Sequence, residues 1–160
     1  MACVNMAIAM QRRMRELQTE WRDRGLQKPF QLRIGINTGY CTVGNFGSED
    51  RMDYTIIGSE VNLASRLQSH AELGGILLSH ETYSLVKDHI IAEERTAIQA
   101  KGITKPVRNY AVVAPVDDLI ARGRAIHEEQ DGLRLLVDFQ KLDKAKAVEV
   151  LEGILTRLKA

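Results

Sequence analysis

The order of apolar patterns along this 160-residue sequence predicts an α/β or α+β fold with its strands in one sheet. The first segment carries apolar residues near helical spacing, and a run of alternating β-branched residues follows it. Strand-like and helix-like segments then alternate as far as residue 113. These observations predict a sheet layered against helices.

The N-terminal part is expected to hold one helix and a hairpin. An amphipathic helix is predicted over residues 2–24. The alternating residues 32–37 predict a strand, and residues 40–43 are expected to return as its hairpin partner. The glycine-containing stretch 44–48 is then expected to be a loop.

The middle of the chain continues the alternation. Ser59 is expected to be the N-cap of a helix over residues 59–70, and Ser79 the cap of a short helix that ends near His89. Gly74-Gly75 marks a break before a buried strand. The strands expected in this part are residues 52–57, 76–78, 93–99 and 107–113.

The character of the sequence changes after Pro115, so we expect one domain over residues 1–115 and a small α-rich appendage over 116–160. In the appendage, residues 117–130 are predicted to be helical, 133–139 to be a short strand and 144–158 to be an amphipathic helix. No chemical motif is found there. A packing, dimerisation or connecting role is expected for it.

Composition limits the classes of partner. Lys and Arg total 22 against 21 for Asp and Glu, a formal net charge of +1. This balance gives no electrostatic reason to expect nucleic acid or an anionic membrane surface as a partner. There is no apolar run of membrane-spanning length and no signal peptide, so the chain is expected to be cytoplasmic, with a membrane reached only through an upstream region.

Cysteine and histidine usage predicts no metal centre. Cys3 and Cys41 are far apart in sequence and are expected to be free thiols. The four histidines do not make the HExxH spacing of a zinc site.

Two polar residues on the helix 59–70 are candidates for ligand binding. Asn62 and Arg66 are four residues apart and therefore project from the same face. An amide and a guanidinium placed this way can grip a ribose and a phosphate, because the planar arginine fork matches phosphate oxygens. On spacing alone, solvated helix positions are the favoured interpretation.

Neither the glycines nor Asp53 adds an independent site. Gly39, Gly44 and Gly47 do not form a GxxxxGK[ST] loop, and GxGxxG is absent. Magnesium catalysis usually needs two carboxylates together with substrate phosphates. Asp53 alone is therefore expected to order the adjacent turn or to pair with a neighbouring base.

Several sequence blocks occur in uninterrupted order and are highly specific together. They are LRIGINTG, RMDYTIIGSEVNLASRL, GGILLS and KGITKPVRNY. With them, most of residues 2–113 resembles the catalytic domain of class III adenylyl/guanylyl cyclases. The resemblance implies an α+β, ferredoxin-like cyclase homology domain that lacks its N-terminal strands.

The resemblance also implies roles for four residues. Asn62 would orient the nucleotide ribose, and Arg66 would stabilise charge on the α-phosphate while the 3′-oxygen attacks it. Lys101, in the KG-x-x-x-P-V motif, would contact the β- and γ-phosphates. Thr55 stands where the family reads the purine base. Thr is typical there of many bacterial adenylyl cyclases, so ATP is favoured over GTP.

The sequence departs from the family where metals should bind. Two metal-binding aspartates normally precede the region seen here, so Mg²⁺ or Mn²⁺ would belong to the intact enzyme and no residue of this chain is assigned to it. In the family, the site forms across a homodimer interface. The resemblance therefore implies a parent enzyme that converts ATP to 3′,5′-cyclic AMP and pyrophosphate, with this chain alone inactive.

A second interpretation stays open beside the enzyme. The missing aspartates also fit a non-catalytic, cyclase-like regulatory or binding module that pairs with another chain. Intact Asn62 and Arg66 favour the enzyme, because a purely regulatory half has no physical need for both. A domain without its central strands exposes unpaired edges, so we expect a poorly stable or self-associating chain.

Overall fold

The computed structural model describes residues 1–48, 51–99, 106–139 and 141–159. Contacts divide the chain into two compact units, Met1–Ala114 and Pro115–Ala160. No helix in the described part of the chain has the length and apolar character that a membrane span requires.

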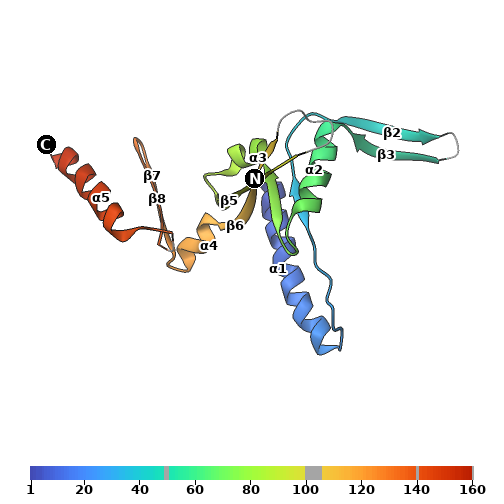
Figure 1. Ribbon diagram of the computed structural model, residues 1–160, viewed down its shortest axis with the longest axis horizontal. Coiled ribbons are helices and arrows are strands. Elements are labelled where there is room, and N and C mark those ends of the chain that lie inside the picture. The colour runs from blue at the N-terminus through green and yellow to red at the C-terminus, as the bar shows by residue number, and fades with distance from the viewer. Residues whose placement is uncertain (49–50, 100–105, 140, 160) are drawn as a thin grey trace. The chain divides into compact units, whose positions relative to one another are not determined.

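The first unit, whose helices α1 to α3 are labelled in Figure 1, is built on a four-stranded mixed sheet. The strand order in this sheet is β1-β4-β6-β5. Strand β1 pairs in parallel with β4, and β4 pairs antiparallel with β6. This arrangement confirms the predicted α+β class. The elements, in chain order, are α1 (Ala2–Asp23), β1 (Ile34–Ile36), β2 (Thr42–Ser48), β3 (Arg51–Ile57), α2 (Ser59–His70), β4 (Ile76–Ser79), α3 (His80–Val86), β5 (Ile90–Ile98) and β6 (Val107–Pro115).

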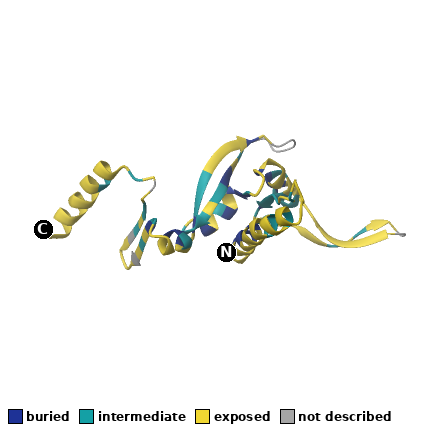
Figure 2. Cartoon of the chain, turned by 90° about the horizontal axis from the view of Figure 1, so that it is seen from below, coloured by how far each residue is buried: buried dark blue, intermediate teal, exposed yellow. Residues whose placement is uncertain are grey.

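Helices cover both faces of this sheet, because alternate residues of β4 point to opposite sides. Ile76 and Leu78 belong to one buried cluster, and Leu77 belongs to the other. The buried residues appear dark blue along the sheet in Figure 2. The first cluster is completed by α1, β1, α3 and β5, through Val4, Ala7, Ile8, Ile36, Val86 and Ile90. The second is completed by α2, its C-cap residue and β5, through Leu63, Leu67, Ala71 and Ile98.

One buried polar side chain fastens α1 to the sheet. The Gln11 amide donates to the carbonyl oxygen of Leu32 at 2.9 Å and to that of Gly75 at 3.2 Å. These carbonyls lie just before β1 and just before β4. A single side chain therefore ties the helix to the starts of two neighbouring parallel strands.

The predicted hairpin between residues 32–37 and 40–43 is wrong. Strand β1 pairs instead with the distant β4, and β2 pairs antiparallel with β3 in the register Val43↔Ile56. The stretch 44–48, expected to be a loop, lies within β2. Pairing β2 with β3 gives seven opposed residue pairs, which a turn at Gly44 would lose.

The two helix starts differ in how they are capped. Ser79 is the N-cap of α3, as predicted, and its hydroxyl accepts from the backbone N–H of Thr82 at 3.2 Å. The N-cap prediction for Ser59 is wrong, because Gly58 occupies that position with φ +153° and Ser59 is already helical. Gly58 has no side chain, so α2 begins without a side-chain cap.

The second unit holds α4 (Val116–Ala121), β7 (Ala125–Gln130), β8 (Leu133–Asp138) and α5 (Lys144–Lys159). The helix predicted over 117–130 is wrong beyond Ala121. Gly123, at φ +65°, follows the end of α4, and β7 then pairs with β8 around Asp131-Gly132. Asp-Gly between apolar residues is a strong hairpin signal, and it prevails over helix propensity here.

Candidate functional site

Helix α2 is held against the sheet through one face. A Cβ at Gly35 of β1 would collide with the backbone nitrogen of Gln68 and the carbonyl oxygen of Ala64. Leu63 and Leu67, on an adjoining face, are buried in the core. The helix is therefore docked backbone to backbone, and its orientation relative to β1 is closely fixed.

Asn62 and Arg66 lie on the other side of this helix. Successive helical residues are rotated by about 100°, so Asn62 lies about 200° from Glu60 and about as far from Ala64. Asn62 is exposed and Arg66 is half-buried. The two side chains predicted to bind the nucleotide thus project from the face opposite the anchored one.

The helix around these two residues is well bonded along its backbone. The N–H of Asn62 donates to the carbonyl of Gly58 at 3.2 Å, in the first turn. In the last turn, the carbonyl of Arg66 accepts from the Ser69 hydroxyl at 2.8 Å and lies 2.9 Å from Nδ1 of His70. Arg66 is therefore presented by a regular helix that continues past it.

Thr55 is positioned by the hairpin that precedes α2. It is exposed in β3 and lies opposite Gly44 of β2. Asp53 shares its face, and an oxygen of that carboxylate lies 3.7 Å from Nε of Arg51. Asp53 therefore pairs with a neighbouring base, one of the two structural roles predicted for it.

The other face of the same hairpin is apolar and uncovered within the first unit. Met52, Tyr54 and Ile56 alternate along β3, and their exposed fractions are 61%, 76% and 47%. Val43, directly opposite Ile56, is 52% exposed. The hairpin appears almost wholly yellow in Figure 2. An isolated two-stranded ribbon is marginally stable in water, so this face favours a partner.

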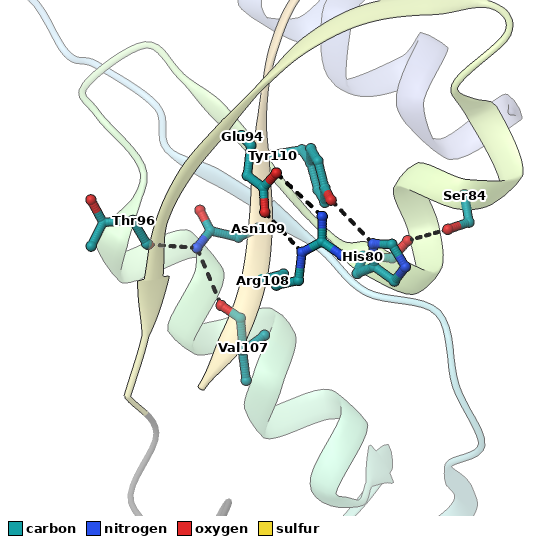
Figure 3. Close-up of polar contacts among 8 residues, drawn as sticks. All are labelled: His80, Ser84, Glu94, Thr96, Val107, Arg108, Asn109 and Tyr110. Atoms are coloured by element: carbon teal, nitrogen blue, oxygen red, sulfur yellow. Dashed lines mark hydrogen bonds and ion pairs between the residues drawn. The ribbon is translucent and has the colours of Figure 1, made fainter. Parts of the chain in front are cut away.

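Lys101, the fourth predicted site residue, lies outside the described residues. The two strands that lead to its segment are fixed by a polar network (Figure 3). Arg108 of β6 forms a forked ion pair with Glu94 of β5, with distances of 2.8 Å and 3.2 Å. The hydrogen bond from Arg108 lowers the pKa of the Glu94 carboxyl below its usual range.

Buried amide and aromatic groups complete this network. Asn109 is 1% exposed and donates to the carbonyl oxygen of Thr96 at 2.9 Å. On the other side of β6, the Tyr110 ring stacks on Tyr83 with a centroid separation of 4.0 Å, and its hydroxyl lies 3.2 Å from Nδ1 of His80. The ends of β5 and β6 nearest Lys101 are therefore rigidly joined.

A cleft of about 720 Å³ opens between the start of α2, the start of α3 and the start of β6. Thr38, Glu60, His80 and Arg108 are among the residues that line it. Thr55, Asn62 and Arg66 do not line it. The face that carries the predicted nucleotide-binding residues is thus separate from this cleft.

Among the described residues, we find no dense cluster of metal-ligating side chains. Within residues 1–48, 51–99, 106–139 and 141–159, no group of three or more His, Cys, Asp or Glu side chains is placed to hold one. Asp53, the carboxylate nearest Thr55 in sequence, stands on the exposed hairpin beside Arg51. Any metal at a site containing this face needs ligands from elsewhere.

The sequence interpretation missed one polar contact on the anchored face of the helix that carries Asn62 and Arg66. Asn37, after β1, donates to Glu60 in the first turn of α2. The signals in the sequence are a polar residue at a strand end and a glutamate on the helical face that also contains Ala64. Neither signal predicts that the two residues are in contact, because the contact forms only when α2 packs on β1.

Comparison with known proteins identifies the class. The profile of the adenylate and guanylate cyclase catalytic domain matches residues 1–114. The chain belongs to this family, as the resemblance predicted.

Individual relatives include both kinds of cyclase. The crystal structure of the adenylyl cyclase CyaB from P. aeruginosa is 59% identical, with a TM-score of 0.65 over 69% of this chain and 56% of that one. The crystal structure of the guanylyl cyclase Cya2 is 35% identical, with a TM-score of 0.63 over 71% and 57%. Adenylate cyclase 1 of Rhizobium meliloti (strain 1021) is 33% identical over 69% of this chain and 17% of its own length. The chain thus spans about half of the solved domains and a sixth of this curated relative.

Proposed function

We propose that this chain supplies one side of a nucleotide cyclase site that, in the intact dimeric enzyme, converts ATP to 3′,5′-cyclic AMP and pyrophosphate. The observation that carries the proposal is the position of Asn62 and Arg66 on the α2 face opposite the anchored one. A rigid helix that presents an amide and a guanidinium together meets the main need of phosphoryl transfer, which is positioning plus electrostatic stabilisation.

Each residue has a distinct part in this reaction. The Asn62 carboxamide orients the ribose, so that the 3′-oxygen lies in line with the α-phosphorus. The Arg66 guanidinium stabilises the charge that develops on the α-phosphate oxygens as pyrophosphate leaves. Lys101 holds the β- and γ-phosphates. Mg²⁺ or Mn²⁺ would belong to the intact enzyme, with ligands from outside the described residues.

ATP is the proposed substrate because of Thr55. Its hydroxyl is exposed on β3 and can both donate to and accept from the edge of an adenine. The name of the 59% identical relative, an adenylyl cyclase, supports the same choice, although a guanylyl cyclase is also among the relatives.

The proposed assembly is a homodimer with the nucleotide between the subunits. Thr55 occupies one face of the β2–β3 hairpin, and the exposed residues Val43, Met52, Tyr54 and Ile56 occupy the other. A second copy that covers the apolar face would stabilise the hairpin, which carries Thr55. The cytoplasmic location expected from the sequence stays a prediction.

The test is cyclic AMP production from ATP with Mn²⁺ in a reconstituted mixture. This chain is mixed with a separately produced segment of P. aeruginosa CyaB that covers the part of that domain this chain does not match. We expect activity in the mixture, none in either part, and loss on Arg66→Ala. Arg15→Ala, at an exposed arginine of α1, is the matched control and should stay active.

The opposite result has a definite meaning. If both parts fold and associate and yet no cyclic AMP forms, the regulatory or binding module becomes the better interpretation. Equal loss in the Arg66 and Arg15 variants would remove the catalytic role of Arg66.

A further inference from the structure

The side chain of Asn37 bridges the end of β1 and the first turn of α2. Its Nδ2 donates to the carboxylate Oε2 of Glu60 at 2.7 Å and to the backbone carbonyl of Glu60 at 3.1 Å. Asn37 is half-buried, as is Glu60. The carboxylate makes the first of these bonds charge-assisted, which is the stronger class of hydrogen bond.

A glycine makes room for this contact. A Cβ at Gly39 would lie 2.5 Å from Cγ and 2.8 Å from Oε2 of Glu60. The Glu60 side chain therefore lies directly over the backbone of Gly39, with the Asn37 amide beside it. The end of β1, the loop that follows it and the first turn of α2 are therefore in direct contact at Glu60.

Together with Gly35, this contact makes a two-point attachment. Gly35 and Asn37 are two residues apart at the end of one strand and so face the same side. Glu60 and Ala64 are four residues apart on α2 and also share a face. Gly35 sets how close the helix lies to β1, and Asn37 sets its position along the helix axis.

The first turn of α2 has no side-chain cap, so its position depends strongly on the contact with Asn37. Its N-cap, Gly58, offers no side-chain acceptor to the free N–H groups of the first turn. The N–H of Asn62 belongs to this same turn, through its bond to Gly58. Movement of the first turn therefore moves Asn62 before it moves any later residue of the helix.

We propose that Asn37 is a positioning residue for the nucleotide site: through Glu60 it fixes the first turn of α2 and thereby the place of Asn62 opposite the ribose. The inference rests on the proposed function. A misplacement of about 1 Å at a reacting centre costs on the order of 100-fold in rate. Asn37 itself touches no substrate and acts through Glu60.

The decisive variant is Asn37→Asp, tested in the reconstituted cyclase mixture. This change replaces the donating amide of residue 37 with a carboxylate, which repels the carboxylate of Glu60. We expect kcat to fall about 100-fold while the KM for ATP changes less than about threefold, since the phosphate contacts are kept. Asn5→Asp, the same chemical change at an exposed position on α1, should leave both values unchanged.

Rescue separates a specific contact from general damage. Glu60→Gln combined with Asn37→Asp restores a donor and an acceptor with their roles exchanged, and kcat should recover about tenfold. The bond to the Glu60 carbonyl stays lost, so recovery is partial. If Asn37→Asp does not fold, Glu60→Ala removes one of the two bonds and should lower kcat about three- to tenfold.

A second readout does not depend on catalysis. Hydrogen exchange of the α2 amides, measured on the full chain, should accelerate in Asn37→Asp at Asn62, whose N–H is bonded to Gly58, and not near Gln68. Unchanged exchange and unchanged kcat would overturn the inference, as would a fall in kcat that Glu60→Gln does not relieve. An inactive wild-type mixture overturns the proposed function and the catalytic part of this inference together, whereas an active mixture insensitive to Asn37→Asp overturns this inference alone.

Discussion

The backbone of Gly35 in β1 lies directly against the backbone of Gln68 in α2. A Cβ at position 35 would overlap the Gln68 nitrogen and its Cα, as well as the Ala64 carbonyl. Backbone atoms cannot rotate away as a side chain can. The spacing between the sheet and the helix that carries Asn62 and Arg66 is thus set by a glycine.

Gly35→Ala should therefore destabilise the first unit. The added methyl group forces α2 away from β1, and overpacking of this kind costs about 1–3 kcal/mol. Urea unfolding followed by the fluorescence of Trp21, the single tryptophan, measures this in the first unit. At Gly44 the nearest atoms to an added Cβ are on the Phe46 ring, at 3.6 Å, so Gly44→Ala serves as the control. Equal losses in the two variants would contradict the close-packing argument.

Much of the fold could be predicted because many elements carry local signals. The helix Ser59–His70 has the predicted bounds, since apolar residues recur at helical spacing between Gly58 and Gly74. The pairing of β1 with β4 could not be predicted from local patterns. The two strands are far apart in the sequence, and their pairing depends on how α2, which comes between them in the chain, packs against the sheet. The larger part of strand β2, residues 44–48, was predicted to be a loop for another reason. Most of its residues are exposed, so no buried face gives it the alternating apolar pattern of a half-buried strand.

For the site, the sequence predicted a shared face but not its surroundings. The spacing of Asn62 and Arg66 places both on one side of a helix, and the structure agrees. Their roles came from the family resemblance, since spacing alone favoured solvated positions. The bond from Asn37 to Glu60 depends on helix docking, which local patterns do not specify.

Asn109→Ala should weaken the joint between β5 and β6. The buried amide is the donor to the Thr96 carbonyl, and its removal leaves that acceptor without its partner. The net loss of one intramolecular hydrogen bond costs about 0.5–1.5 kcal/mol. Urea unfolding measured through Trp21 should show this loss, whereas Asn5→Ala on exposed α1 should stay within about 0.5 kcal/mol of the parent chain. No difference between the two variants would show that the bond adds nothing to stability.

Ile56→Lys should weaken self-association. Ile56 and Val43 form a directly opposed pair on the uncovered face of the hairpin, and a lysine there would carry charge into the proposed contact between two copies. Loss of a central apolar contact of this kind typically weakens binding tenfold or more, or about 1.4 kcal/mol. Sedimentation analysis at several concentrations gives the dissociation constant. Leu85→Lys, at a 68% exposed position on α3, is the control. If only the Leu85 variant dissociates, the hairpin is not the contact surface.

Thr55→Cys should relax the choice between ATP and GTP. A thiol is a weak donor and acceptor, so the hydroxyl bond to the purine edge is lost while the side-chain size is nearly kept. One such bond is worth about a factor of ten, so the ratio of kcat/KM for ATP to that for GTP should fall about tenfold in the reconstituted mixture. Thr42 is exposed on the same face of the hairpin and lies opposite Ile57, which makes Thr42→Cys a matched control with an unchanged ratio. A ratio that moves equally in both variants would assign the effect to the hairpin as a whole. A ratio that stays constant in both would mean that Thr55 does not read the base, while the assignments of Asn62 and Arg66, which rest on α2, would be unaffected.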